Sequence, residues 1–257
     1  TPESSIALVD ELEHGLEPHR IAKFLFALGA KDTSAPPQVF ITTHSPVVLR
    51  ELSGDQLFIT RKTNTKHNVI AVGTEDAIQG TIRKSAEAFL GVNILVCEGA
   101  TEVGLIRGID LYRSDKGKKT LMASGGVAVD AGGVSKIYRT ARSFQKLGYN
   151  VASLRDDDKA PAKEDEDKFT AAGGKVFKWT DKLALEDEIF KCVPKKTVLK
   201  LYNYAVEEHG EDIVHANLIS ALNQAICVEE WLNDITDDKR ETIAKAAKTG
   251  SWFKRIS

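Results

Sequence analysis

The sequence is poor in cysteine and has no long hydrophobic run, and both absences exclude classes of protein. Its 257 residues include three cysteines, Cys97, Cys192 and Cys227, which are far apart and odd in number. This pattern argues against a disulfide framework or a cysteine-rich zinc site and favours free thiols in a reducing, cytoplasmic compartment. No apolar run reaches the roughly 18–20 residues of a membrane helix, and no signal-peptide pattern opens the chain. We therefore expect no membrane partner.

An excess of charge of one sign is also lacking. The chain carries 35 Lys and Arg against 37 Asp and Glu, for a net charge of −2. Bulk electrostatics alone therefore gives no argument for a nucleic-acid partner. Any binding of an anion requires a local basic patch or bound cations. The composition, 42% hydrophobic and 28% charged, is that of a globular chain long enough for one large domain or two small ones.

Strand-like and helix-like segments alternate over the first 180 residues, which predicts an α/β fold with a parallel sheet flanked by helices. From Leu183 onward, apolar residues recur at helical spacing. We expect a division near residues 90 and 180, giving parts 1–90, 91–180 and 181–257. Strands are expected at 5–9, 39–43, 56–60, 68–72, 93–97, 120–124, 126–130, 149–158 and 175–179.

Acidic residues follow the first of these strands. The segment SIALVDE places Asp10 and Glu11 at the end of an apolar run, and ITTHSP places His44 at the end of the next strand. These motifs, in this order, resemble the Walker B motif, the D-loop and the switch histidine of ABC-type ATPases. The resemblance implies that Asp10 holds a water of the Mg²⁺ shell, Glu11 polarises the attacking water and His44 contacts the γ-phosphate of ATP.

The phosphate-gripping part of such a site is absent from the sequence. No G-x-x-x-x-G-K-[ST] loop occurs, and AGGVSK at 131–136 has the wrong spacing. The ABC signature loop is also missing. We therefore expect residues 1–90 to be the carboxyl half of an ATPase lobe whose other half lies upstream. On this reading ATP is a cofactor of the intact protein only, and this chain alone does not hydrolyse ATP.

A second set of acids follows later strands. Glu98 stands at the end of an apolar strand, and Glu102 falls four residues on, in the first turn of the next helix. Asp156 and Asp158 follow another strand; if extended, they share a face and Asp157 points away. Because parallel strands end at one edge of the sheet, these carboxylates can converge there. Such a cluster is unstable without divalent cations, and hard oxygen ligands favour Mg²⁺.

Three glycines accompany these acids. Gly99 is expected to allow a tight turn after Glu98, and Gly132 and Gly133 to form a strand–helix turn. A strand-end Glu followed by a later D-x-D resembles the Toprim domain of topoisomerases, primases and certain nucleases. An ABC-type ATPase half followed by Toprim is similar to the OLD (overcoming lysogenization defect) family of endonucleases, and this resemblance covers nearly the whole chain.

The resemblance implies a metal-dependent DNA endonuclease in which two ions, Mg²⁺ or Mn²⁺, assist hydrolysis of a phosphodiester. It also implies a fifth acid and a late lysine that stabilises transition-state charge. We prefer Glu186 over Asp187 and Glu188, and Lys254 over Lys248. The implied catalytic residues are Glu98, Glu102, Asp156, Asp158 and Lys254, and the implied metal ligands are Glu98, Glu102, Asp156, Asp158 and Glu186.

Several alternatives remain open at this point. Arg155 is either a phosphate contact or the polar edge of its strand, and the acids at 186–188 are equally typical of a helix start. The chain could instead be a non-catalytic Toprim and ATPase module that binds DNA or a partner, or it could take part in strand passage or priming. A homodimer through the ATPase or Toprim region is expected, and the pathway, phage defence or DNA repair, is left undecided.

Overall fold

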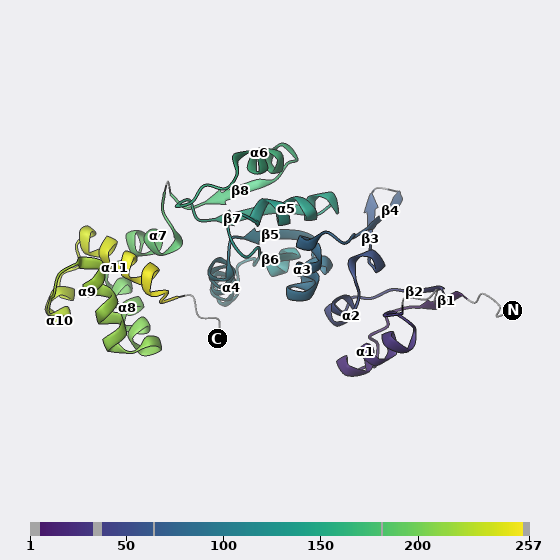
Figure 1. The fold of residues 1–257 in the computed structure, drawn as a ribbon, viewed down its shortest axis with the longest axis horizontal. Helices are drawn as coiled ribbons and strands as arrows, with labels where there is room; N and C mark the ends of the chain where they lie inside the picture. The colour runs from purple at the N-terminus through teal and green to yellow at the C-terminus, as the bar shows by residue number, and fades with distance from the viewer. Residues whose placement is uncertain (1–5, 33–37, 64, 181, 254–257) are drawn as a thin grey trace.

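The structure is a computed structural model that describes residues 6–32, 38–63, 65–180 and 182–253. Three parts follow one another along the molecule: a small unit with the N-terminus, a central sheet with its helices, and a lobe of helices (Figure 1). Within the described ranges, no helix is both long and apolar enough to cross a membrane. The central sheet holds the second set of acids predicted above.

The central sheet is parallel throughout, with strand order β6-β5-β7-β8. Its strands are β5 (Asn93–Cys97), β6 (Gly126–Asp130), β7 (Asn150–Arg155) and β8 (Lys175–Lys178). The helices that connect them are α4 (Ala100–Asp115), α5 (Ile137–Lys146) and α6 (Lys163–Ala171). The predicted α/β class, with a parallel sheet flanked by helices, is therefore confirmed.

Strand β5 is apolar on both faces because helices cover both sides of the sheet. Ile94 and Val96 pack into the main core with Phe144 of α5, whereas Cys97 packs with Val103 of α4. Side chains alternate between faces along a strand, so a strand covered on both sides has an unbroken apolar sequence. This explains the run ILVC at the centre of the sheet.

The strand order determines where a site can form. Strand β5 lies between β6 and β7, so the chain leaves β5 toward one side of the sheet and leaves β7 toward the other. Connections that diverge in this way leave a crevice beyond the carboxyl ends of the two strands. Glu98 follows β5 and Asp156 follows β7, so both residues stand at this crevice.

Two predicted strands differ from the structure. Residues 120–124 form a turn and the short 3₁₀ helix η3 (Met122–Ser124), because the carboxylate of Asp110 accepts the N–H groups of Leu121 and Met122. A side chain that takes up these backbone donors competes with strand pairing. Strand β7 stops at Arg155, so the three aspartates lie in a bend beyond it, not in an extended strand.

The N-terminal unit contains two short sheets. Strands β1 (Ile6–Val9) and β2 (Gln38–Ile41) pair in parallel, and β3 (Phe58–Thr63) and β4 (Lys66–Ala71) form a hairpin. The accompanying helices are α1 (Pro18–Ala27), α2 (Pro46–Glu51), η1 (Gly54–Gln56), α3 (Asp76–Lys84) and η2 (Ala86–Leu90). Pro18 occupies the first turn of α1, where its missing N–H costs no hydrogen bond.

The cores do not follow the predicted division near residue 90. A small core under β1 and β2 contains Leu12, Ile21, Leu25 and Val48. Buried residues between Leu49 and Phe89 instead share the main core with the central sheet. The predicted three-part division itself stays a prediction.

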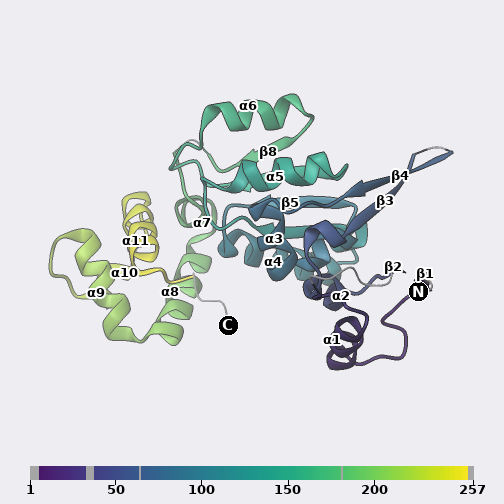
Figure 2. The same cartoon turned by 45° about the vertical axis from the view of Figure 1, so that its right-hand side comes forward.

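The C-terminal lobe is helical, as the spacing of apolar residues after Leu183 predicted. Its helices are α7 (Leu185–Cys192), α8 (Lys195–His209), α9 (Glu211–Leu222), α10 (Val228–Leu232) and α11 (Asp237–Gly250). In Figure 2, α7 lies beside the sheet, and α9, α10 and α11 lie farther from it. They enclose their own core, which includes Phe190, Leu218 and Trp252. Helix α7 links the two parts, since Phe190 enters this core while Glu186 faces the sheet edge.

Candidate functional site

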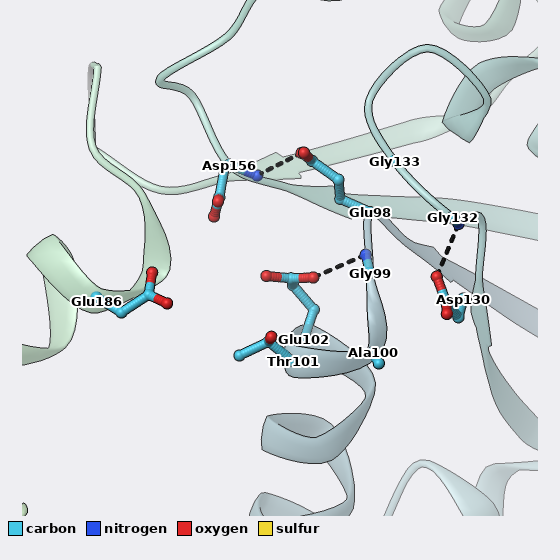
Figure 3. A pocket seen from close by; sticks show the side chains of 10 residues that line it. All are labelled: Glu98, Gly99, Ala100, Thr101, Glu102, Asp130, Gly132, Gly133, Asp156 and Glu186. Atoms are coloured by element: carbon cyan, nitrogen blue, oxygen red, sulfur yellow. Dashed lines mark hydrogen bonds between the residues drawn. The ribbon is translucent and has the colours of Figure 1, made fainter. Parts of the chain in front are cut away.

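A hollow of about 340 Å³ lies at the carboxyl edge of the central sheet, between α4 and α7. Five carboxylates line it, and four of them were predicted: Glu98 after β5, Glu102 in α4, Asp156 after β7 and Glu186 in α7. Figure 3 shows their side chains directed toward a common space. The structure thus brings together four of the five predicted metal ligands.

Backbone N–H groups hold three of these carboxylates in place. The N–H of Gly99 donates to Glu102 Oε2 at 2.8 Å, at the start of α4. The N–H of Asp156 donates to Glu98 Oε2 at 3.2 Å, which ties the end of β7 to the end of β5. The N–H of Leu185 donates to Asp156 Oδ1 at 3.0 Å, at the start of α7.

Glu186 is the least satisfied of the four acids. Its residue is only 4% exposed, and its Oε1 has no hydrogen-bond partner among the residues that the structure describes. A buried polar atom without a partner costs free energy, so such an atom is unusual in a folded protein. Because Glu186 lines the hollow, a small rotation of its side chain would turn this carboxylate toward a ligand there.

Burial and mutual repulsion disfavour the charged form of these acids. The pKa of Asp156 is raised to about 7, first by desolvation and then by the charges of Glu102 and Glu98. Desolvation also raises the pKa of Glu98 and of Glu102. No lysine or arginine is among the described residues that line the hollow. A cation bound here would favour the ionised form of all of them.

The middle aspartate has a structural role. Asp157 turns away from the hollow, as predicted, but it is not solvated: its side chain is 15% exposed and pairs with Arg155 and Lys178. The N–H of Lys182 and these cations hold the pKa of Asp157 below its usual value. Its fixed charge anchors the bend that carries Asp156.

Both predictions made for Arg155, a phosphate contact and the polar edge of its strand, are wrong. It is 4% exposed and donates to the carbonyl oxygen of Asp156 at 2.7 Å and to Asp157 at 2.9 Å. It also pairs with Glu166 at 3.1 Å. Arg155 is therefore neither a phosphate contact nor a polar edge, because its guanidinium fastens the aspartate bend to the sheet and to α6.

Asp158 stands beside the hollow and not in its lining. Its Oδ2 accepts from Lys248 Nζ of α11 at 2.7 Å. Asp187 Oδ2 is 3.8 Å from the same nitrogen. These contacts raise the pKa of Lys248 despite the opposing effect of burial, so its ammonium stays charged. The pair brings the helical lobe to the edge of the acidic site.

Of the two candidate lysines from the sequence, the structure describes only one. Lys248 lies next to the predicted acids, whereas Lys254, the preferred candidate, falls outside the described residues. The preference for Lys254 therefore stays a prediction, and of the two lysines the structure describes only Lys248, which pairs with Asp158. The sequence could not decide between the two lysines, because the packing of α11 on α7, which brings Lys248 to the sheet edge, is a tertiary contact.

The three consecutive acids of α7, at 186–188, differ in what they contact. Glu186 lines the hollow, as preferred. Asp187 accepts the N–H of Ala184 at 3.0 Å, and Glu188 accepts the N–H of Thr180 at 3.3 Å. These two acids therefore serve the helix start, which was the alternative reading of the segment.

Asp130 lines the hollow and was not singled out in the sequence. It ends β6, and its Oδ1 accepts the N–H of Gly132 at 2.7 Å, so it is turned toward its own loop (Figure 3). An acid at a strand end was the signal that could have found it. Gly132 and Gly133 adopt φ values of +76° and +117°, as expected of a strand–helix turn that needs glycine. Gly99, at φ −147°, adopts a conformation open to other residues.

The N-terminal acids form a separate and open group. Asp10 and Glu11 follow β1, and His44 follows the neighbouring β2, and all three are exposed. The hydroxyl of Thr42 donates to Asp10 and accepts the N–H of Glu11 at 3.0 Å. The structure therefore places the predicted ATPase residues at one edge of the two-stranded sheet.

The acidic hollow fits a hard divalent cation. Its donors are carboxylate oxygens, and one of them is buried without a partner. Among the described residues, no three of these acids have oxygens that all lie within 4.8 Å of one another. Mg²⁺ suits such a site because it keeps several of its waters, and Mn²⁺ takes similar ligands.

Comparison with known proteins bears on the N-terminal unit. Residues 1–50 match the family described as "AAA domain, putative AbiEii toxin, Type IV TA system". No curated protein matches the chain. The match covers the segment with Asp10, Glu11 and His44, so the chain begins with an ATPase-like region, and ATP binding is supported at this end.

Proposed function

We propose that this chain is the carboxyl-terminal part of an OLD-family protein and that its central sheet is a Toprim domain with metal-dependent DNA endonuclease activity. The observation that carries the proposal is the convergence of Glu98, Glu102, Asp156 and Glu186 on one hollow. Support comes from the orphaned Oε1 of Glu186 and from the raised pKa of Asp156, to about 7, caused by burial and the neighbouring acids. A divalent cation bound in the hollow would provide a partner for Glu186 and would favour the ionised form of Asp156.

The four acids of the hollow would hold the ions, with Asp158 beside them. Bound Mg²⁺ or Mn²⁺ supplies an activated water and stabilises the leaving oxygen of a phosphodiester. Glu102 and Asp156 are already oriented by the N–H groups of Gly99 and Leu185, so little ordering remains when a substrate binds. Lys248, held by Asp158, offers a positive charge for the phosphate of DNA at the rim.

The ATPase-like region supports a role for ATP in the intact protein. Asp10, Glu11 and His44 are exposed at the end of β1 and β2, apart from the acidic hollow. We therefore assign ATP to regulation or dimerisation of the intact enzyme and the nuclease chemistry to the central sheet. A homodimer formed through either region is part of this proposal.

Conversion of supercoiled plasmid to nicked and linear forms tests the proposal. With Mg²⁺ or Mn²⁺, wild-type protein is expected to cut, and Asp156→Asn is expected to lose at least about 100-fold in rate, since loss of even an outer partner of a metal ligand costs 10–100-fold. Asp167→Asn is the matched control, because Asp167 is an exposed acid of α6 that lies outside the hollow. Equal cutting by both variants would show that the hollow is not the active site.

A wild-type protein that binds DNA without cutting it in either metal would instead favour the non-catalytic alternative. Calorimetry with Mg²⁺ separates the cases further. The proposal requires metal binding that Asp156→Asn weakens and that Asp167→Asn preserves. DNA binding that is independent of divalent metal would point to a scaffold.

A further inference from the structure

A second group of possible metal ligands lies in the helical lobe, away from the acidic hollow. Glu211 and His215 are four residues apart on α9, so they lie on one face of the helix. Glu229 comes from the first turn of α10. One donor atom from each of the three lies within 4.8 Å of the other two. Helices separated in the chain thus present a histidine nitrogen and two carboxylates at one point.

The spacing of these donors suits an ion better than direct contact. His215 Nε2 and Glu211 Oε1 are 3.7 Å apart, which is too long for a hydrogen bond. Zinc bonds nitrogen and oxygen at about 2.0–2.2 Å, so two ligands of one tetrahedral ion stand roughly 3.3–3.6 Å apart. A small side-chain adjustment therefore brings the pair to ligand separation.

An independent feature beside the group is the hydroxyl of Tyr202 in α8. Tyr202 is 4% exposed, and its hydroxyl has no hydrogen-bond partner within the described part of the chain. Its ring stacks on that of His215, with centroids 6.3 Å apart. Burial raises its pKa to about 12, and the next causes are the charges of Glu211 and Glu229. The buried tyrosine with the unused hydroxyl is therefore in ring contact with one of the three candidate ligands.

A thiol stands next to the same carboxylate. Cys227 Sγ donates to Glu229 Oε2 at 3.2 Å, and Cys227 immediately precedes α10. The sulfur is not one of the donor atoms that lie within 4.8 Å of one another, so the thiol stands beside the group of three and not within it.

We propose that Glu211, His215 and Glu229 bind one zinc ion, which joins α9 to α10 beside the buried hydroxyl of Tyr202. The imidazole ligand selects a borderline-soft ion such as Zn²⁺, in contrast to the oxygen-lined hollow. Three protein ligands leave one position of a tetrahedral ion for water. Because the unfolded chain does not preform these ligands, bound zinc stabilises the folded lobe.

Zinc titration calorimetry of the full chain, combined with thermal unfolding, tests this proposal. The background variant is Asp156→Asn, which weakens metal binding in the acidic hollow. We expect one Zn²⁺ per chain and a zinc-dependent rise in Tm. His215→Ala is expected to reduce zinc affinity at least tenfold and to abolish the rise. His67→Ala, which removes an exposed histidine in the β3–β4 hairpin, is expected to change neither.

Further variants keep the test decisive. Glu211→Gln keeps the size of an exposed side chain and is expected to weaken zinc binding even if His215→Ala fails to fold. Cys227→Ser is expected to leave the zinc affinity unchanged, because the thiol is not among the three ligands. Absence of zinc binding, or equal affinity in the His215, Glu211 and His67 variants, would overturn the site. A loss of zinc affinity in Cys227→Ser as large as that in His215→Ala would overturn the three-ligand assignment.

Discussion

Two regions of this molecule share a sequence pattern and differ in what surrounds it. In both the ATPase-like region and the central sheet, an apolar strand ends in an acid, with a second acid close behind. The side chain of Glu11 is 51% exposed, whereas Glu102 is 5% exposed. Water therefore solvates the first pair, while burial raises the pKa of both acids of the second pair, Glu98 and Glu102. Burial, and not the number of acids, makes a carboxylate cluster demand a metal.

The packing around the strands explains the difference. Within the described residues, β1 pairs with β2 alone, and Leu8 remains 79% exposed. Strand β5 has a neighbour on each side, and α4 and α7 cover the end of it. Each added layer removes water from the carboxylates that follow the strand. Among the described residues, Asp10 and Glu11 are exposed to water, and the hydroxyl of Thr42 and the ring of His14 contact them. In the hollow, Glu98, Glu102 and Asp156 accept hydrogen bonds from backbone N–H groups.

Among the variants that distinguish the two regions, the largest effect is expected from Lys248→Ala, on the rate of DNA cleavage. Loss of its ammonium from the rim should reduce the rate of DNA cleavage by about 10²–10³-fold, the usual effect of removing one electrostatic stabiliser. Calorimetry should show Mg²⁺ affinity unchanged, because Lys248 is not a metal ligand. Lys245→Ala, an exposed lysine on the same helix, is the control. Equal rates in the two variants would show that Lys248 serves only to dock α11.

A large loss of stability is expected from Arg155→Gln. This change leaves Asp157 and Glu166 without their buried cation, which costs roughly 3 kcal/mol in the free energy of unfolding. Urea denaturation measures it. Arg142→Gln removes a more exposed pair with Asp165 and should cost about 0–1 kcal/mol. A similar small cost for Arg155→Gln would mean that the aspartate bend holds without its arginine.

The pH dependence of Mg²⁺ binding tests whether the acids of the hollow are as desolvated as their burial indicates. The pKa of Asp156, about 7, lies above its usual value of 3.8, so between these values the folded state keeps a proton that the unfolded state has released. Its stabilising contribution is therefore full at low pH and is lost as pH rises toward 7. Mg²⁺ must displace the same proton, so affinity should rise by up to about tenfold per pH unit below 7 and then level off.

Calorimetry across that pH range checks this expectation. In Asp156→Asn the rise should flatten, leaving only the part due to Glu98 and Glu102, whose pKa values are also raised by burial. Affinity that is independent of pH in the wild type would show that Asp156 is already ionised and that the hollow is less desolvated than its packing indicates.

The smallest effect is expected from Glu11→Gln. Its side chain is exposed and bonds only to His14, so the free energy of unfolding should change by no more than about 0.5 kcal/mol. Plasmid nicking should be unchanged, and neither this variant nor the wild-type chain should hydrolyse ATP. Appreciable ATP turnover by the wild type, lost in Glu11→Gln, would show that the ATPase-like region is complete in this chain.

Local patterns predicted most of the central sheet. The apolar runs at 93–97 and 126–130 became strands with buried residues, whereas the run at 175–179 became the mostly exposed edge strand β8, which pairs with β7. The strand predicted at 120–124 does not form, because Asp110, ten residues before this segment begins, accepts the N–H groups of Leu121 and Met122. The pattern of a strand contains no information about a distant side chain that competes for its backbone.

The sequence by itself determined the class of fold and the strand-end positions of Glu98 and Asp156, because apolar periodicity and strand–helix alternation are local properties. Only the tertiary structure decided which acids share a hollow. It brought Glu186 from α7 to the sheet edge, paired Asp158 with Lys248, and turned Asp157 to Arg155. The zinc ligands of the helical lobe likewise meet only through the packing of α9 and α10. The reason is physical: burial and charge pairing arise between elements that are distant in the chain.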